Sequence, residues 1–398
     1  MRKYVVRRVL EIILTLYIYV TLVFFILQAM PGDVTQFLIE NPQLDVEVRE
    51  MLKHELGLDQ PLHLQYLTYL KNFFRGQFGR SFSHYPRPVW DIIKERLPRT
   101  ALLFVTATIL SFYLGFFLGK LIAWRRGQLI EYTSTVTGVM LWTVFTPMFA
   151  LLLIWGFAVI LNIFPINNFL EPEKWLKVNM EANTVFLYLI ATIGGLFLLT
   201  LSSFLLSRRL SDKRARLLAF LVPTTVGAVA TLLAWKLSGQ CWGALAKYGG
   251  QVCLPDLALD IIWHMGLPVM TLTLIAFGGT MLLMRSSMLE TIREDYVMAA
   301  KAKGLPDKVV RDKHAARNAM LPVITSFVLS LALSIDGGII TETLFSWPGM
   351  GLTLLNSVLE NDYPLAIGAL VFVGILALIA HLVADILYAY LDPRIRYD

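Results

Sequence analysis

The feature that most constrains this chain is a series of apolar runs, each about 20 or more residues long. A helical run of this length crosses the ~30 Å hydrocarbon layer of a bilayer, where every backbone polar group must be satisfied within the helix. The charged content of 16% is below the ~25% of an average soluble domain and agrees with this interpretation. We predict eight membrane spans, at residues 9–30, 99–123, 133–161, 183–206, 217–237, 264–287, 321–342 and 363–390.

The first run follows a basic start, which is also how a cleaved signal peptide begins. The run is too long for the apolar part of a typical signal peptide, and no A-x-A cleavage pattern follows it. We therefore expect residues 1–30 to be retained as the first transmembrane helix.

The distribution of basic residues predicts the orientation of the spans. With the N-terminus in the cytoplasm, most Lys and Arg residues fall in cytoplasmic segments, as the positive-inside rule requires. The short segments on the other side keep only Lys174, Lys177, Lys236 and Lys247. Both termini are therefore predicted to be cytoplasmic, and residues 31–98 are predicted to form a small helical domain outside the membrane. The net charge of +6 then reflects orientation in the bilayer and not nucleic-acid binding.

A charged stretch, EDYVMAAKAKGLPDKVVRDKHAARNAMLP at residues 294–322, interrupts the apolar pattern. Gly304 can end a helix in the left-handed conformation, and Pro306 can begin the next one. Tyr296, Ala300 and Gly304 recur every four residues and predict a narrow face that suits insertion into a groove of another protein. The alternative is a solvated basic loop without a partner.

This stretch resembles the cytoplasmic "EAA" loop of ABC importer permeases, in the peptide, nickel and oligosaccharide subfamily. The resemblance covers most of the chain outside residues 170–262. In the loop the matching residues are Asp295-Tyr296-Val297, Ala299-Ala300, Ala302-Lys303-Gly304-Leu305, His314-Ala315, Arg317-Asn318-Ala319 and Leu321-Pro322. Elsewhere they are Met30-Pro31-Gly32-Asp33, Leu56-Gly57-Leu58-Asp59-Gln60-Pro61, Phe78-Gly79-Arg80-Ser81, Arg96-Leu97-Pro98-Arg99-Thr100, Glu342-Thr343-Leu344-Phe345, Trp347-Pro348-Gly349-Met350-Gly351, Asp362-Tyr363-Pro364 and Leu391-Asp392-Pro393-Arg394-Ile395-Arg396.

The resemblance implies an all-α, polytopic membrane protein with the six-span core of a type I ABC importer permease. Residues 183–206 and 217–237 would be an inserted hairpin of two extra spans. The implied domains are the first helix at 1–30, an extracytoplasmic helical domain at 31–98, spans two and three at 99–169, the inserted region at 170–262, and the rest of the core at 263–398, with a cytoplasmic coupling loop at 285–320.

The implied function is that of a permease subunit in the cytoplasmic membrane, forming half of the translocation path of an ATP-driven, binding-protein-dependent importer. The substrate would be an oligopeptide, with an oligosaccharide as the alternative. Partners would be a second homologous permease, two ABC ATPase subunits and an extracytoplasmic solute-binding protein. The chain itself would be no enzyme and hold no cofactor, since ATP and Mg²⁺ would be bound by the ATPases.

The coupling helix implied by the resemblance would contact an ATPase subunit. The generic motif has Glu where this chain has Met298. The residues of the implied coupling helix are Asp295, Tyr296, Val297, Met298, Ala299, Ala300, Lys301, Ala302, Lys303, Gly304 and Leu305.

Two acids and two cysteines are further candidates. Asp336 and Glu342 are candidates for the translocation path, because ionisable groups in spans are costly and usually functional. The alternatives are a structural hydrogen bond for Asp336 and a capping carboxylate for Glu342. Cys241 and Cys253 fall in one predicted outside segment, where disulfides persist, so we expect them to be joined. The alternative for them is two free thiols.

Other function classes fit the sequence less well. An ion-coupled transporter predicts inverted repeats and acids at midplane, and a membrane enzyme predicts clustered catalytic or metal-binding side chains. Neither pattern is convincing in this sequence. Gly115 and Gly119-Lys120 resemble a phosphate loop only faintly, because the spacing is short by one residue and no Ser or Thr follows. We interpret both glycines as a close helix contact.

Overall fold

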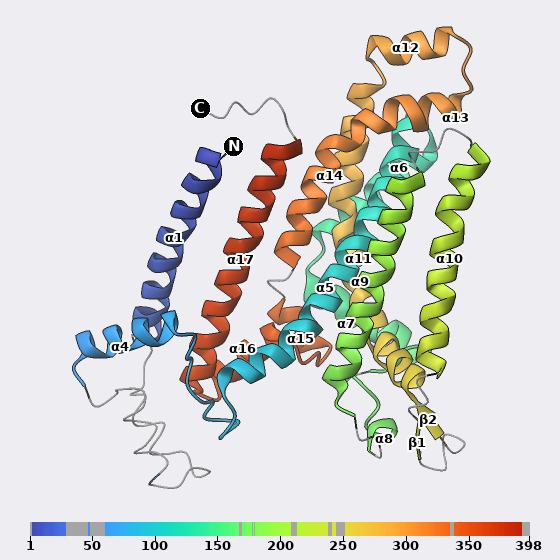
Figure 1. Ribbon diagram of the computed structural model, residues 1–398. Coiled ribbons are helices and arrows are strands. Elements are labelled where there is room, and N and C mark those ends of the chain that lie inside the picture. Colours follow the sequence, from blue (N-terminus) through green and yellow to red (C-terminus); the bar gives the residue numbers. More distant parts are fainter. Residues whose placement is uncertain are drawn as a thin grey trace. The chain divides into compact units, whose positions relative to one another are not determined.

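The computed structural model describes residues 2–28, 47, 60–166, 169–176, 178, 180–207, 213–237, 241–243, 251–334 and 338–391, most of them helical. The chain divides into two compact units. Figure 1 labels their helices and strands. The first comprises Met1–Leu153 and Pro268–Asp398, and the second comprises Ile154–Leu267.

The first unit contains the two ends of the chain. Its helices are α1 (Arg2–Gln28), α4 (Leu62–Phe74), α5 (Val89–Trp124), α6 (Leu129–Thr143), α7 (Thr146–Leu153), α12 (Asp295–Ala302), α13 (Asp307–Val309), the π-helix η3 (Val310–Ala315), α14 (Ala316–Leu333), α15 (Ile339–Leu344), α16 (Met350–Leu359) and α17 (Tyr363–Leu391). The second unit contains the π-helix η1 (Ile154–Ile160), α8 (Pro172–Trp175), α9 (Ala182–Ser207), α10 (Lys213–Leu237) and the antiparallel strands β1 (Cys241–Gly243) and β2 (Gln251–Cys253). Helix α11 (Leu254–Thr291) begins in the second unit and ends in the first.

Four helices of the described chain are long and apolar enough to cross a membrane, at Val6–Ile26, Val89–Trp124, Leu254–Thr291 and Tyr363–Val383. A fifth span results if the bent pair Leu129–Thr143 and Thr146–Ile160 counts as one. The chain is therefore polytopic, and the count of eight stays a prediction.

Two predicted spans are not continuous helices. In the span predicted at 133–161, Val144 is extended and the two helical halves meet at 108°. Pro147 explains this break, because proline fits the first turn of a helix but not its interior. In the span predicted at 321–342, Gly338 is extended just before α15 begins. Glycine forms helix poorly, which explains that break.

Pro98, in contrast to Pro147, does not break its helix. The sequence predicts an outside domain that ends at residue 98 and a span that begins at residue 99, but residues on both sides of Pro98 belong to the 36-residue helix α5. Thr100, two residues later, is completely buried. The helix therefore runs past a proline that removes one of its backbone hydrogen bonds.

A buried carboxylate joins α5, α15 and α16. Thr100 Oγ1 donates to Glu342 Oε1 at 2.7 Å, and the Leu352 N–H donates to Oε2 at 2.9 Å. Thr100 Oγ1 also accepts from the Met350 N–H at 2.7 Å. Glu342 and Thr100 thus satisfy N–H groups of the first turn of α16. Three resemblance motifs, around Thr100, Glu342 and Trp347–Gly351, form this one contact.

Asp362 makes a second contact of this kind, directly before α17. Its Oδ1 accepts from the Leu365 N–H at 3.2 Å, as the side chain of an N-cap does. Its Oδ2 accepts from the Ser83 N–H at 3.0 Å, from Ser83 Oγ at 2.7 Å and from Ser81 Oγ. The side chain is completely buried and fixes the loop before α5 to the start of α17.

Helix α11 packs closely against α5 and α6 in the first unit. A Cβ added at Gly115 of α5 would lie 2.7 Å from the Phe277 carbonyl oxygen of α11. Gly138 of α6 and Gly278 of α11 likewise leave no room for a side chain between their helices. The predicted close helix contact at Gly115 is therefore confirmed, and its partner is α11.

An ion pair ties α6 to α11. Glu131 is 4% exposed, and Arg285 Nε lies 3.0 Å from its Oε1. The Gly127 N–H donates to Glu131 Oε2 at 2.6 Å. The carboxylate is thus buried with both oxygens bonded, and loss of Arg285 would leave it without its cation.

We expect Arg285→Met to lower the stability of the folded permease by about 1–3 kcal/mol, because it removes a charged hydrogen-bond donor from the Glu131 carboxylate. The thermal unfolding temperature of the purified protein in detergent measures this effect. The double variant Glu131→Gln/Arg285→Met should recover most of the loss, since it removes both charges. Full stability of the single variant would contradict a structural role for this pair.

Candidate functional site

Helix α12 lies between α11 and α14 in the chain, and a sharp turn follows it. The helix begins at Asp295 and ends at Ala302, and Gly304 then has the left-handed φ of +70°. Pro306 precedes α13 in an extended conformation. A Cβ added at Gly304 would meet nothing within 4 Å, so glycine is favoured there by its backbone and not by lack of space. The predicted helix end at Gly304 is confirmed.

The inner face of α12 packs on its own chain. Val297 and Ala300 are buried with Val310 and Ala315 of η3 and with Met288 of α11. The prediction that Tyr296, Ala300 and Gly304 form one docking face is therefore wrong. Ala300 points inward while Tyr296 is 39% exposed, and the helix ends before Gly304, so a four-residue spacing does not extend that far.

The outer face of α12 is a short apolar strip. Met298 is 54% exposed, and Ala299 and Ala302 beside it are also exposed. Lys301 and Lys303 are exposed on the same helix or at its end. This surface offers apolar contacts with charges of both signs beside them, since Asp295 at the start of the helix is also exposed.

Two contacts join α12 to its neighbours. Asn318 Nδ2 of α14 donates to Tyr296 Oη at 2.6 Å. Lys301 Nζ lies 5.1 Å from the ring centroid of Trp124, the last residue of α5, within the range of a cation–π contact. Displacement of α12 would therefore act on α14 and α5 together.

Asp312 joins η3 to α5. Its Oδ1 lies 3.2 Å from Lys120 Nζ, and Arg311 donates two hydrogen bonds to the same carboxylate at 2.9 and 3.0 Å. The hydrogen bonds from Arg311 lower the pKa of Asp312 to about 2; partial burial opposes them and Lys120 supports them. Asp312 is therefore ionised throughout the physiological pH range, and the link to Lys120 persists.

The two candidates for the translocation path have different outcomes. Asp336 lies outside the described residues. Glu342 is completely buried, and its carboxylate caps α16, which is the structural alternative for this residue. Sequence reasoning missed its partner Thr100, because 242 residues separate the two.

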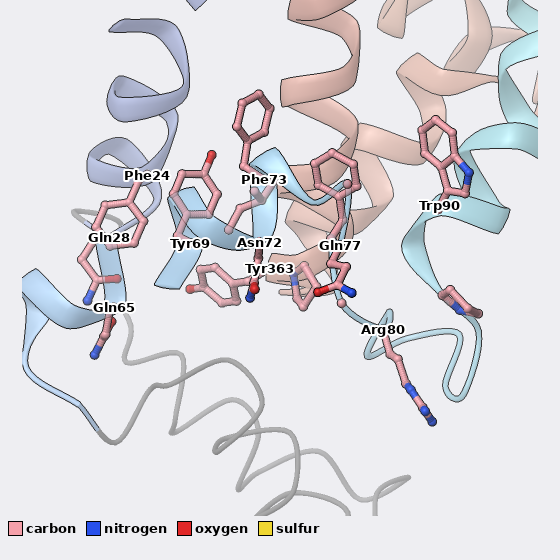
Figure 2. Close-up of a pocket in the computed structure, with 16 residues that line it drawn as sticks. Phe24, Gln28, Gln65, Tyr69, Asn72, Phe73, Gln77, Arg80, Trp90 and Tyr363 are labelled. Carbon is pink, nitrogen blue, oxygen red and sulfur yellow. The ribbon is translucent and has the colours of Figure 1, made fainter. Parts of the chain in front are cut away.

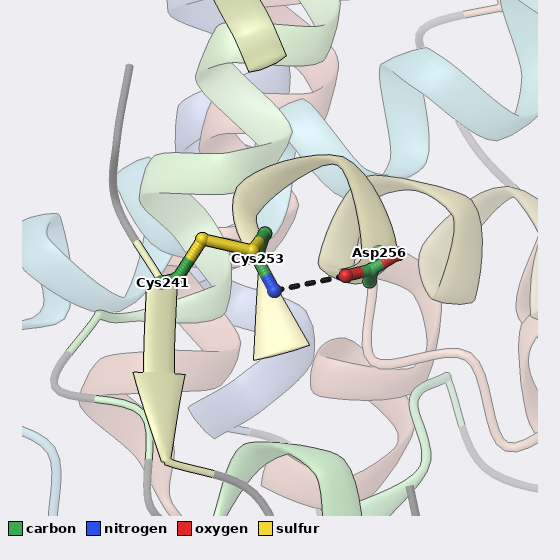
Figure 3. Close-up of a disulfide and its surroundings, with 3 residues drawn as sticks. All are labelled: Cys241, Cys253 and Asp256. Carbon is green, nitrogen blue, oxygen red and sulfur yellow. Dashed lines mark hydrogen bonds between the residues drawn. A yellow bond between two sulfur atoms is a disulfide. The ribbon is translucent and has the colours of Figure 1, made fainter. Parts of the chain in front are cut away.

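The two cysteines of the chain are joined in the second unit. A disulfide connects Cys241 and Cys253, which are partners in the register of β1 and β2 and whose Cα atoms lie 4.0 Å apart. The Cys253 N–H donates to Asp256 Oδ2 at 2.9 Å, at the start of α11 (Figure 3). The disulfide thus holds the strand that leads into α11.

Asp260 organises the polar part of the second unit. Its carboxylate accepts from the Glu171 N–H and from Trp175 Nε1, both at 2.9 Å, and Lys174 Nζ lies 3.3 Å away. The side chain is almost fully buried beside a hollow of about 1000 Å³. Within the described residues, no group of three or more His, Cys, Asp or Glu side chains could hold a metal ion.

Two family models together match nearly the whole chain. Residues 111–397 match the model described as "Binding-protein-dependent transport system inner membrane component". Residues 1–104 match the model of the N-terminal part of such membrane components.

Several curated proteins are similar over their full length. The oligopeptide transport system permease protein AppB of Bacillus subtilis is 30% identical, with 100% of both chains covered. The dipeptide transport system permease protein DppB of Lactococcus lactis is also 30% identical, again with 100% of both chains covered. The di/tripeptide transport system permease protein DppB of Pseudomonas aeruginosa is 28% identical at the same coverage. Together with the helical, polytopic fold, these matches place the chain in the family of binding-protein-dependent transport system inner membrane components.

Proposed function

We propose that this chain forms half of the translocation path of an ATP-driven importer of short peptides. Three relatives of full length are named as oligopeptide, dipeptide or di/tripeptide permeases, which favours a peptide over an oligosaccharide. The proposed partners are a second, homologous permease, two ATPase subunits that bind ATP and Mg²⁺, and the binding protein that the family's description implies.

The proposed topology has eight spans with both termini in the cytoplasm. Helices α9 and α10 are then the extra pair, and the segment between α1 and α5 lies on the extracytoplasmic side. The positive-inside distribution supports this orientation. In this arrangement α12 lies on the cytoplasmic side, where an ATPase subunit can reach it.

The observation that carries the proposal is the construction of the α12 region. The helix is short, it is held at both ends by long helices, and one of its faces is buried while the other is an exposed apolar strip. We propose residues 295–305 as the coupling helix. Tyr296 and Lys301 connect it to α14 and α5, and the link between Asp312 and Lys120 connects the following turn to α5. Movement of a docked ATPase would then be transmitted to α5 and α14, and also to α11, because Met288 packs on the inner face of α12.

Met298 determines the chemistry of the proposed contact. It stands where the generic motif has Glu, and it is the most exposed large apolar side chain of α12. A thioether packs well into irregular apolar surfaces. We propose that the ATPase surface opposite Met298 is apolar.

The main test concerns Gly304. Gly304→Val forces a β-branched residue into the left-handed region at a cost of about 1–2 kcal/mol or more, whereas asparagine tolerates that region. In proteoliposomes containing the complete importer, we expect Gly304→Val to reduce ATP-dependent peptide uptake about tenfold with normal amounts of permease in the membrane. Gly304→Asn is the matched control and should stay near wild type. Equal uptake by both variants would contradict the coupling role.

A second test concerns Met298. Met298→Asp should weaken co-purification of the ATPase subunits with the permease about tenfold or more, because an ion would be buried in an apolar contact. Met298→Leu keeps the size and apolar character of the side chain and should retain the complex. Retention of the complex by the aspartate variant would show that the opposite surface is not apolar.

The disulfide offers a test of the proposed topology. Mass spectrometry of the non-reduced protein should show peptides joined through Cys241 and Cys253. In intact cells, a membrane-impermeant reductant followed by an impermeant alkylating reagent should label both cysteines, because disulfides persist outside the cytoplasm. Labelling only after the cells are opened would contradict the proposed placement of α9 and α10.

A further inference from the structure

Helix α4 packs across the last turns of α1. Tyr66 Oη lies 2.8 Å from Thr21 Oγ1, and Tyr69 Oη donates to the Val20 carbonyl at 3.3 Å. The rings of Phe24 and Tyr69 stack with centroids 5.2 Å apart, as Figure 2 illustrates. The contact between the helices therefore lies beside residues 20–24 of α1.

These contacts fix the depth of α4 in a bilayer. Residues 20–24 belong to Val6–Ile26, the apolar stretch of α1 that is long enough to cross a membrane. Thr21 lies five residues before Ile26, which corresponds to about 8 Å along a helix. If α1 spans the bilayer, α4 lies at the boundary between lipid headgroups and acyl chains, and not in a domain beyond the headgroups.

The sequence of α4 has three faces at helical spacing. The face on α1 and α17 consists of Tyr66, Tyr69, Leu70 and Phe73. A polar face consists of Gln65, Thr68 and Asn72. The third face consists of Leu64, Leu67, Lys71 and Phe74, all of them exposed.

The third face has the chemistry of a lipid contact. Leu67 is 57% exposed and Phe74 is 76% exposed. Lys71 lies between them, and its long side chain can reach the headgroups while its stem stays among the acyl chains. Leu22 and Ile26 of α1 are also largely exposed, so the apolar surface of the span continues at this level. Of the possible occupants, the bilayer is therefore the one that the depth of α4 favours.

We propose that α4 is an interfacial helix, with its face of Leu64, Leu67, Lys71 and Phe74 inserted at the headgroup–acyl boundary of the bilayer. The tyrosines on its inner face hold it to the last turns of α1. This inference changes the interpretation of residues 62–74, which the sequence alone places in a domain outside the membrane. It requires only that α1 spans the bilayer and does not depend on the transported substrate.

The test uses the full-length permease in lipid nanodiscs. Leu67→Cys is labelled with an environment-sensitive maleimide dye, and the native cysteines do not compete because they are joined in the disulfide. Thr68→Cys, one residue further on the polar face, is the matched control. Phe74→Cys repeats the measurement on the third face in case the first variant folds poorly. Each label is exposed to lipids with a nitroxide near the headgroup and, separately, to aqueous iodide.

We expect the lipid nitroxide to quench the label of Leu67→Cys and of Phe74→Cys roughly threefold more strongly than that of Thr68→Cys, with the reverse order for iodide. Strong iodide quenching of the Leu67→Cys label without lipid quenching would place this face in water and overturn the proposal. Protection of that label from both quenchers would mean that protein covers the face, which also overturns it.

Discussion

A backbone group buried inside the protein has no water to bond with, so each place where a helix begins or ends in the core needs partners from nearby side chains. In the first unit the breaks around α15, α16 and α17 follow this constraint. Glu342 and Thr100 satisfy the N–H groups at the start of α16, and Asp362 does so at the start of α17. The polar residues of the resemblance motifs are buried here because they end and begin helices.

Helix α11 connects the packed helices of the first unit to the candidate coupling site. Gly278 and the ion pair of Arg285 hold it against α6, and further contacts hold it against α5. Its last residues lead into α12, whose inner face packs back onto Met288. The exposed strip around Met298 therefore lies on a helix whose inner face packs against α11 and η3.

The positions of most helices could be predicted because membrane spans are set by apolar length. The starts and ends of α9 and α10 lie close to the predicted spans for this reason. A single residue such as Pro147 or Gly338 hardly changes the length of an apolar run, so the breaks in these two predicted spans were not predicted. Pro98 shows the converse, since a proline that weakens a helix by one hydrogen bond does not have to end it.

In the candidate site, too, a feature that depends on one residue could be predicted, and a feature that depends on packing between helices could not. The turn at Gly304 could be predicted because it depends on the stereochemistry of one residue. Which face of α12 is free could not, since it depends on η3 and α11 packing against Val297 and Ala300. Helices α9 and α10, the proposed inserted pair, also contact each other within the second unit: Trp235 donates to Thr192, and Gly227 of α10 lies against Leu199 of α9. These contacts lie within the hairpin itself. Because a hairpin adds two helices, the helices that follow it keep their direction.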